Sequence, residues 1–273
     1  MKRIKGFVAT LDVLGFSELL QRESYSEQLK SYLDCVNDVI RPANVKAECV
    51  VFSDSIVLTS PGNDDAAFET VIRTCSAAFR ALLKNEIPVR GAIAFGSYYR
   101  EARAGSVFLA GRPIVEAYRC ERSSDWVGIL LCPSVIHQQS GLGGSTWIPD
   151  VEELSSFEDL GTEEFDEAFT AVALRLQSAT VPFLDSETRA VGELSGYAIV
   201  PAEADDTIET IPRTVASARR SLDDLRLKAP RPRAQAKYKT SLSWLDDIQK
   251  RLTMLRKLYR AAAKRKPEQK SVS

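Results

Sequence analysis

Two aspartates in this chain stand among apolar residues. Asp12 ends the apolar run 7–11 and precedes a turn that contains Gly15, and Asp54 separates the apolar runs 49–52 and 56–58. Removing a carboxylate from water costs several kcal/mol unless a cation, a hydrogen-bond cage or a metal compensates for it. Carboxylate oxygens are the ligands that hard divalent cations prefer. The pair therefore predicts a metal site.

Hydrophobic spacing predicts the elements that would position these acids, in the order strand, helix, strand, strand, helix, strand. This βαββαβ order is typical of the α+β, ferredoxin-like arrangement, a four-stranded antiparallel sheet with two helices on one face. The end of the first strand and the hairpin of the second and third strands are neighbours there, so we expect Asp12 and Asp54 to meet at one edge of the sheet. The six elements are predicted at residues 5–11, 16–39, 47–52, 55–58, 66–84 and 88–96.

The second half of the chain is predicted to add helices and a few strands. A helix over 111–122 is followed by a strand over 127–131, and Pro133 ends that strand. A proline-rich break at 228–233 precedes a basic amphipathic helix over 237–264. The remaining predictions are a helix near 165–177, strands near 181–184 and 196–200, and a helix near 213–227.

Charge and cysteine usage exclude several classes of protein. The net charge is −1, which predicts no general affinity for nucleic acid, although residues 228–273 carry 14 Lys and Arg against 3 acids. Five cysteines without a CxxC pair indicate buried reduced thiols and favour the cytosol. No run approaches the ~18 apolar residues of a membrane span. A single histidine excludes a His-based triad or a His-rich metal site.

Four blocks resemble the catalytic domain of class III nucleotidyl cyclases, the adenylate and guanylate cyclase family. Residues 12–17 (DVLGFS) resemble its Asp-Ile-x-Gly-Phe-Ser/Thr block, and 52–55 (FSDS) its Gly-Asp-Ser/Ala block. Residues 89–96 (VRGAIAFG) resemble its Gly-Ile-x-x-Gly strand, and 111–119 (GRPIVEAYR) its Gly-x-x-Val-Asn-x-Ala-x-Arg helix. The resemblance predicts a cyclase domain over 1–201 and a helical extension over 202–273.

This resemblance implies attack of the ribose 3′-oxygen on the α-phosphorus of a nucleoside triphosphate, with loss of pyrophosphate. It implies two Mn²⁺ or Mg²⁺ ions held by Asp12, Asp54 and the backbone of Val13. The turn Val13, Leu14, Gly15 and Phe16 opens a helix and would receive phosphate oxygens. In the family, an arginine from the other protomer stabilises the phosphates, and here it would be Arg119. The implied enzyme is a homodimer with active sites at its interface.

The positions that read a purine base in this family are apolar here. Val50 stands where adenylate cyclases have Lys and guanylate cyclases have Glu, Phe108 replaces an Asp or Cys, and Val115 replaces the Asn. This pattern looks most like the pyrimidine cyclases of bacterial Pycsar antiphage systems, which make cyclic UMP or cyclic CMP for a separate effector protein. Uracil and cytosine are both left open. Leu184 takes the place of the family's phosphate-binding Lys, whose role could pass to Arg112, Arg189 or Lys237.

Simpler readings compete with these roles. Asp12 could cap the following helix, Arg119 could pair with Glu116 or Glu121 on a helix surface, and Val50 and Phe108 could be core residues. Three other functions stay open. They are an adenylate or guanylate cyclase with an atypical base pocket, a cyclase-like module that binds nucleotide without turnover, and a nucleic-acid binder that uses the basic tail.

Overall fold

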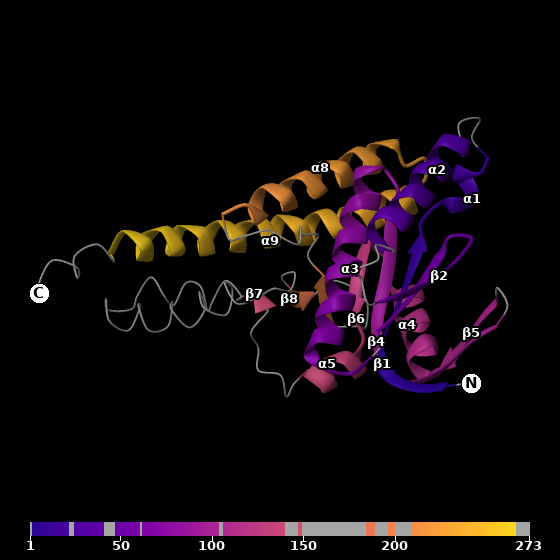
Figure 1. Ribbon diagram of the computed structural model, residues 1–273. Helices are drawn as coiled ribbons and strands as arrows, with labels where there is room; N and C mark the ends of the chain where they lie inside the picture. Colours follow the sequence, from indigo (N-terminus) through magenta and orange to yellow (C-terminus); the bar gives the residue numbers. More distant parts are fainter. Residues whose placement is uncertain are drawn as a thin grey trace, which may run out of the picture.

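The computed structural model describes the chain over residues 2–21, 25–40, 47–60, 62–103, 106–139, 147–148, 184–188, 196–199 and 209–265. The described strands form one sheet in the order β2-β3-β1-β4-β6-β9-β8-β7, and β5 pairs with the far part of β4 (Figure 1). Helix α3 (Asp65–Lys84) lies along one face of this sheet, and α4 (Arg112–Ser123) lies on the other. No helix among the described residues combines the length and the apolar character that a membrane crossing requires.

The first four strands of the chain confirm the predicted ferredoxin-like sheet. Strand β1 (Lys2–Val13) pairs antiparallel with both β3 (Ser55–Thr59) and β4 (Val89–Arg103), and β2 (Glu48–Phe52) pairs with β3. β1 is therefore central, with almost every residue from Gly6 to Val13 buried. Its apolar run is continuous because a central strand is covered on both faces.

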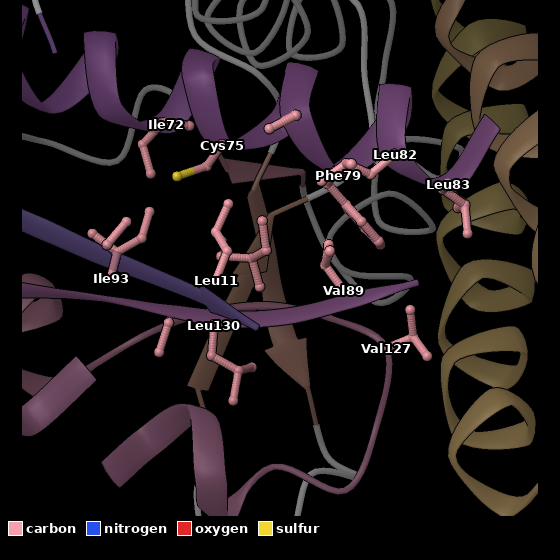
Figure 2. Packing of buried hydrophobic residues seen from close by; sticks show 14 of the residues in the cluster. Leu11, Ile72, Cys75, Phe79, Leu82, Leu83, Val89, Ile93, Val127 and Leu130 are labelled. Carbon is pink, nitrogen blue, oxygen red and sulfur yellow. The ribbon is translucent and has the colours of Figure 1, made fainter. Parts of the chain in front are cut away.

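The core lies between α3 and the sheet. The N-cap of α3 is Asp64, whose side chain accepts a hydrogen bond from the backbone N–H of Ala67 at 2.8 Å. Figure 2 shows the apolar side of α3 above side chains of the strands, which is the packing that its helical spacing predicts. The labelled residues are Ile72, Cys75, Phe79, Leu82 and Leu83 of the helix and Leu11, Val89, Ile93, Val127 and Leu130 below it.

The single helix predicted over 16–39 is wrong. The structure has α1 (Phe16–Leu19), α2 (Tyr25–Cys35) and a π-helical turn η1 (Val36–Ile40). The polar stretch 21–24 offers no apolar residue to pack on the core, so the apolar spacing lapses there and α1 stops. The predicted turn at Gly15 is confirmed, because Gly15 has φ +74° and precedes α1.

Strand β4 and its partner β5 (Ser106–Gly111) extend beyond the prediction, which ended the strand at Gly96 and assigned no β5. Gly96 is a point of close approach rather than a strand end. A Cβ there would lie 3.4 Å from Cδ of Pro113 in α4. Gly96 therefore marks the close approach of α4, and the prediction that the strand ends at Gly96 is wrong.

Later elements agree in type with the predictions wherever the structure describes them. Strand β6 (Gly128–Leu131) pairs parallel with β4 and is followed by α5 (Pro133–Gln139), which was not predicted. β9 (Gly196–Ile199) pairs antiparallel with β6 and β8, the strand β8 (Leu184–Thr188) pairs with β9, and the short β7 (Trp147–Ile148) pairs parallel with β8. The helix predicted near 165–177 and the domain boundary at 201/202 lie outside the described residues.

Helices α8 (Ile211–Lys228) and α9 (Pro232–Arg265) pack side by side along one end of the core, and α9 continues past it (Figure 1). The Arg219 guanidinium of α8 pairs with the Asp246 carboxylate of α9. Apolar residues from both helices belong to the same buried cluster as the sheet: Ile211, Val215, Leu222, Trp244, Leu245 and Ile248. The C-terminal helices are therefore packed on the sheet and share its core.

Candidate functional site

The end of β1 and the β2–β3 turn meet, as the sequence predicted for Asp12 and Asp54. Asp12 pairs in register with Ser55, the residue directly after Asp54. The backbone N–H of Val13 donates to the carbonyl oxygen of Asp54 at 3.0 Å. The two acids, 42 positions apart in the sequence, are thus joined through their own backbones.

Further backbone contacts hold this junction. The N–H of Leu14 donates to the carbonyl oxygen of Pro88 at 2.8 Å, which ties the turn after β1 to the start of β4. Tyr32 of α2 donates its hydroxyl to the carbonyl oxygen of Ser53 at 3.3 Å. Ser53 has φ +55°, a conformation unusual for a residue with a side chain, so this contact helps to fix the turn that carries Asp54.

A buried ion-pair chain lies beside Asp12. Alternation along β1 places Asp12 on the face opposite to Leu11, the face that α4 covers. Arg90, its register partner on β4, reaches the Oδ2 of Asp12 with Nη2 at 3.2 Å and the Oε1 of Glu121 with Nε at 3.1 Å. The Glu121 side chain is only 4% exposed. We call Asp12, Asp54, Arg90 and Glu121 the acid end.

The acid end is electrostatically crowded. Burial raises the pKa of Asp12, the Arg90 charge works against this, and the Asp54 charge raises the pKa further. Burial also raises the pKa of Glu121 to about 7, and the Asp12 charge adds to the rise while Arg90 opposes it. Asp12 and Glu121 therefore share one guanidinium, and Asp54 adds a further negative charge beside Asp12.

This charge balance fits a divalent cation. Asp12 and Asp54 repel each other, and a hard cation between their oxygens would relieve that repulsion. The carbonyl oxygen of Val13 is the next backbone acceptor after Asp12. In the described part of the chain, no group of three or more His, Cys, Asp or Glu side chains is arranged to hold a metal by itself. Two carboxylates with a backbone oxygen leave coordination positions for waters or a substrate, as is usual for Mg²⁺.

Arg119 is separated from the acid end on α4. The buried side of this helix carries Ala117, Cys120 and Glu121, while Arg119 is exposed on the other side. Val115 and Tyr118, which are 48% and 50% exposed, share that outer side. Glu121 is buried and pairs with Arg90, so the alternative in which Arg119 pairs with Glu121 is excluded.

The predicted base-reading positions are also not gathered at the acid end. Phe108 lies on β5 and is 54% exposed, so the alternative that it is a core residue is wrong. Val50 lies half-buried on β2, and Val115 is on the exposed side of α4. We use β5–α4 face as a name for the exposed residues of these two elements, Val107 and Phe108 of β5, which point to opposite sides of that strand, and Val115, Tyr118 and Arg119 of α4.

Sequence reasoning missed Arg90 and Glu121. Both lie inside blocks that were recognised, but only the strand register and the buried side of α4 bring them to Asp12. The signal available was a charged residue directly after a buried Val89 and a Glu on the helix side that otherwise carries Ala and Cys. The cysteine prediction is confirmed for four residues, Cys35, Cys75, Cys120 and Cys132, which are free and buried, while Cys49 is free and half-buried.

No family model and no curated protein matches this chain. Among solved structures it is similar to the non-canonical dimeric guanylyl cyclase domain of the RhoGC fusion protein from the aquatic fungus Blastocladiella emersonii. That match has 15% identity and a TM-score of 0.42 and covers 52% of this chain and 86% of the other. The adenylyl cyclase CyaB from P. aeruginosa gives 16% identity, a TM-score of 0.39, and coverage of 52% and 83%.

A third similar structure is a class III adenylyl cyclase-like ATP-binding protein from Pseudomonas aeruginosa, with 11% identity and a TM-score of 0.36. It covers 89% of this chain and 71% of the other. At these identities, the activity of this chain must be argued from its own residues.

Proposed function

We propose that this protein is a homodimeric nucleotidyl cyclase that converts UTP or CTP to the 3′,5′-cyclic nucleotide and pyrophosphate. The observation that carries the proposal is the junction of Asp12 and Asp54 through the Val13 to Asp54 hydrogen bond. Together with the four sequence blocks, it supports a metal-nucleotide site at the acid end.

In this proposal Asp12, Asp54 and the Val13 carbonyl hold two Mn²⁺ or Mg²⁺ ions. When bound, these ions would lower the pKa of the 3′-hydroxyl and neutralise the triphosphate. Arg90 holds one oxygen of Asp12 and leaves Oδ1 for the cation. Glu121, pinned on the same guanidinium, keeps Arg90 from turning away.

The turn after β1 would receive the phosphates, but with fewer donors than the sequence suggested. Val13 and Leu14 already donate their N–H groups to Asp54 and Pro88. Gly15 and Phe16 are then the residues of this turn whose N–H groups a phosphate oxygen would use. Helix α1 has only 4 residues, so its macrodipole adds little.

The remaining half of the site would come from a second protomer. The β5–α4 face exposes apolar side chains beside Arg119, and exposed apolar patches are typical of interaction surfaces. Arg119 from the second protomer would then meet the phosphates, where charge builds on the bridging oxygen.

The base pocket would include Val50, Phe108 and Val115. A site built to hydrogen-bond a purine discriminates through polar groups that these positions lack, which favours a smaller pyrimidine base. We propose that the product acts in antiphage signalling in the cytoplasm and is read by a separately encoded effector protein; the sequence resemblance to pyrimidine cyclases supports this proposal.

One product assay tests the proposal. The protein is incubated with each of the four nucleoside triphosphates and Mn²⁺, products are separated by chromatography, and Asp54→Asn serves as the matched control. We expect cyclic UMP or cyclic CMP with one pyrophosphate per turnover. Cyclic AMP or cyclic GMP as the sole product would contradict the pyrimidine assignment but keep the cyclase.

A second function is nucleotide binding without turnover, favoured by the absence of the family's polar residues at Val50, Phe108 and Val115. Two results together would establish this function instead. Pyrophosphate release would be equal for the wild type and Asp54→Asn, and only the wild type would bind nucleotide in a metal-dependent way.

A further inference from the structure

The beginning of α9 is fixed against the acid end of the sheet. The Ser241 hydroxyl accepts a buried hydrogen bond from the backbone N–H of Val127 at 2.8 Å. The rings of Trp244 and Trp126 meet edge to face, with centroids 5.0 Å apart. Just before the helix, Arg231 lies 3.7 Å from Glu18 of α1, the helix that follows the Gly15 turn. These contacts connect the start of α9 with the segment that leads into β6, next to β4, and with the helix that follows the predicted phosphate turn.

Lys237 lies one helical turn before Ser241 and points to the same end. Its Nζ is 3.3 Å from the Oδ1 of Asp125, and its side chain is only 20% exposed. The segment that Lys237 pairs with leads into β6, whose first residue, Gly128, is the register partner of Arg90, and Arg90 contacts Asp12. The ammonium group thus lies at the end of the sheet that carries Asp12, although it belongs to a helix outside the ferredoxin-like sheet.

The pair that Lys237 forms in this structure is weak enough to exchange. Asp125 is 60% exposed, and pairs with a solvent-exposed carboxylate contribute little to stability. A bound triphosphate offers several oxygens and more negative charge than one carboxylate. Because the Ser241 and Trp244 contacts hold the helix, moving the ammonium from Asp125 to a phosphate needs only rotation of the lysine side chain.

From this geometry we infer that Lys237 is a triphosphate-binding residue, contributed to the site by the C-terminal helix. The inference rests on the proposed function for the presence of a metal-nucleotide site at Asp12 and Asp54. It makes the start of α9 part of the site, where the Ser241 and Trp244 contacts hold the helix that carries this half-buried lysine.

The test measures binding of inorganic tripolyphosphate in the presence of Mn²⁺, a probe that does not depend on which base is read. Lys237→Ala is expected to weaken binding at least about tenfold, the usual loss for a charge-assisted hydrogen bond. Lys237→Arg keeps the charge and is expected to retain most of the affinity. Lys239→Ala, which removes an exposed lysine two positions away, is the matched control and is expected to bind as the wild type does.

Asp125→Asn separates phosphate binding from a purely structural pair. If Lys237 only anchors α9, breaking the pair from either side has the same effect. If Lys237 binds phosphate, Asp125→Asn leaves the affinity unchanged or increases it, because the ammonium loses its competitor. Thermal unfolding of each variant verifies that the fold is intact.

Wild-type affinity in Lys237→Ala, or an equal loss in Asp125→Asn, overturns the inference while leaving the proposed cyclase untouched. A wild type that makes no cyclic nucleotide but binds tripolyphosphate through Lys237 overturns the activity alone. A wild type with no metal-dependent binding overturns both.

Discussion

The acid end and the β5–α4 face differ in how far a single chain completes them. At the acid end, Asp12 and Glu121 share Arg90, and the Asp54 turn is fixed by hydrogen bonds from the Val13 backbone N–H and the Tyr32 hydroxyl. On the β5–α4 face, Phe108, Val115 and Tyr118 are each about half exposed. Contacts within one chain hold the acid end in place, whereas the side chains of the β5–α4 face are exposed to solvent.

This difference indicates how a site of this kind divides its tasks. Residues that hold metal need positions fixed before substrate arrives, because misplacement by about 1 Å is costly. Residues that contact the substrate opposite the metal can come from a second protomer. The interface that brings this protomer close is then an exposed, apolar surface in each single chain. Four predictions test this division, beginning with the largest effect.

Asp54→Asn is expected to reduce cyclisation by about a thousandfold or more, since it removes a charge that would hold the metal while the backbone junction stays in place. The measurement is pyrophosphate release with the preferred nucleotide. The variant must keep the thermal stability of the wild type. Activity within tenfold of the wild type would show that Asp54 does not hold the metal, so the acid end would not be the metal site.

Arg119→Ala is expected to reduce the rate by about a hundredfold to a thousandfold, the usual effect of losing one group that stabilises transition-state charge. Arg213→Ala, which removes an exposed arginine of α8, is the control. Mixing Arg119→Ala with Asp54→Asn sharpens the test, because a mixed dimer would contain one intact site. Recovery of activity on mixing is expected, and its absence would argue that Arg119 serves its own chain.

Val115→Asp is expected to weaken self-association by about tenfold or more, because it would bury an unpaired charge in the proposed interface. Sedimentation velocity over a range of protein concentrations measures the effect. Leu227 on α8 is 68% exposed and offers a matched control away from this face, as Leu227→Asp. If both variants dissociate equally, or neither does, the β5–α4 face is not the interface.

Sequence reasoning was strongest where short-range pattern decides the structure. The alternation and turn chemistry around Asp12, Gly15 and Asp54 specified a strand end and a hairpin, and the βαββαβ order then implied their meeting. The sheet order confirms this meeting. The blocks also placed Arg119 on a helix, although its catalytic role remains a prediction.

Long-range contacts could not be predicted in the same way. Arg90 and Glu121 meet only because the register of β4 and the rotation of α4 point them at one another, and neither is encoded by local spacing. Strand β5 escaped prediction because residues 98–103, the part of β4 that it pairs with, have two adjacent tyrosines followed by two adjacent charged residues, which breaks the alternation signal. Lys237 was one of three candidates that the sequence offered, and its proposed role depends on the packing of α9, which local spacing does not encode.

The smallest expected effect concerns stability rather than activity. Glu121 has a pKa of about 7 in the folded chain against an ordinary value of 4.5, so the folded state binds its proton more tightly than the unfolded state does. The stabilisation is fully present below pH 4.5 and is lost as the pH rises through about 7, by up to about 3 kcal/mol. Asp12, whose pKa is also raised, contributes in the same direction.

Glu121→Gln is therefore expected to flatten the decline in unfolding free energy between pH 5 and pH 8, measured by urea titration at each pH. Glu27→Gln, at an exposed position on α2, controls for the loss of one negative charge. If both variants keep the slope of the wild type, Glu121 is ionised over the whole range and Arg90 neutralises it completely. The acid end would then carry less uncompensated charge than its geometry indicates, and Asp12 and Asp54 alone would have to attract the metal.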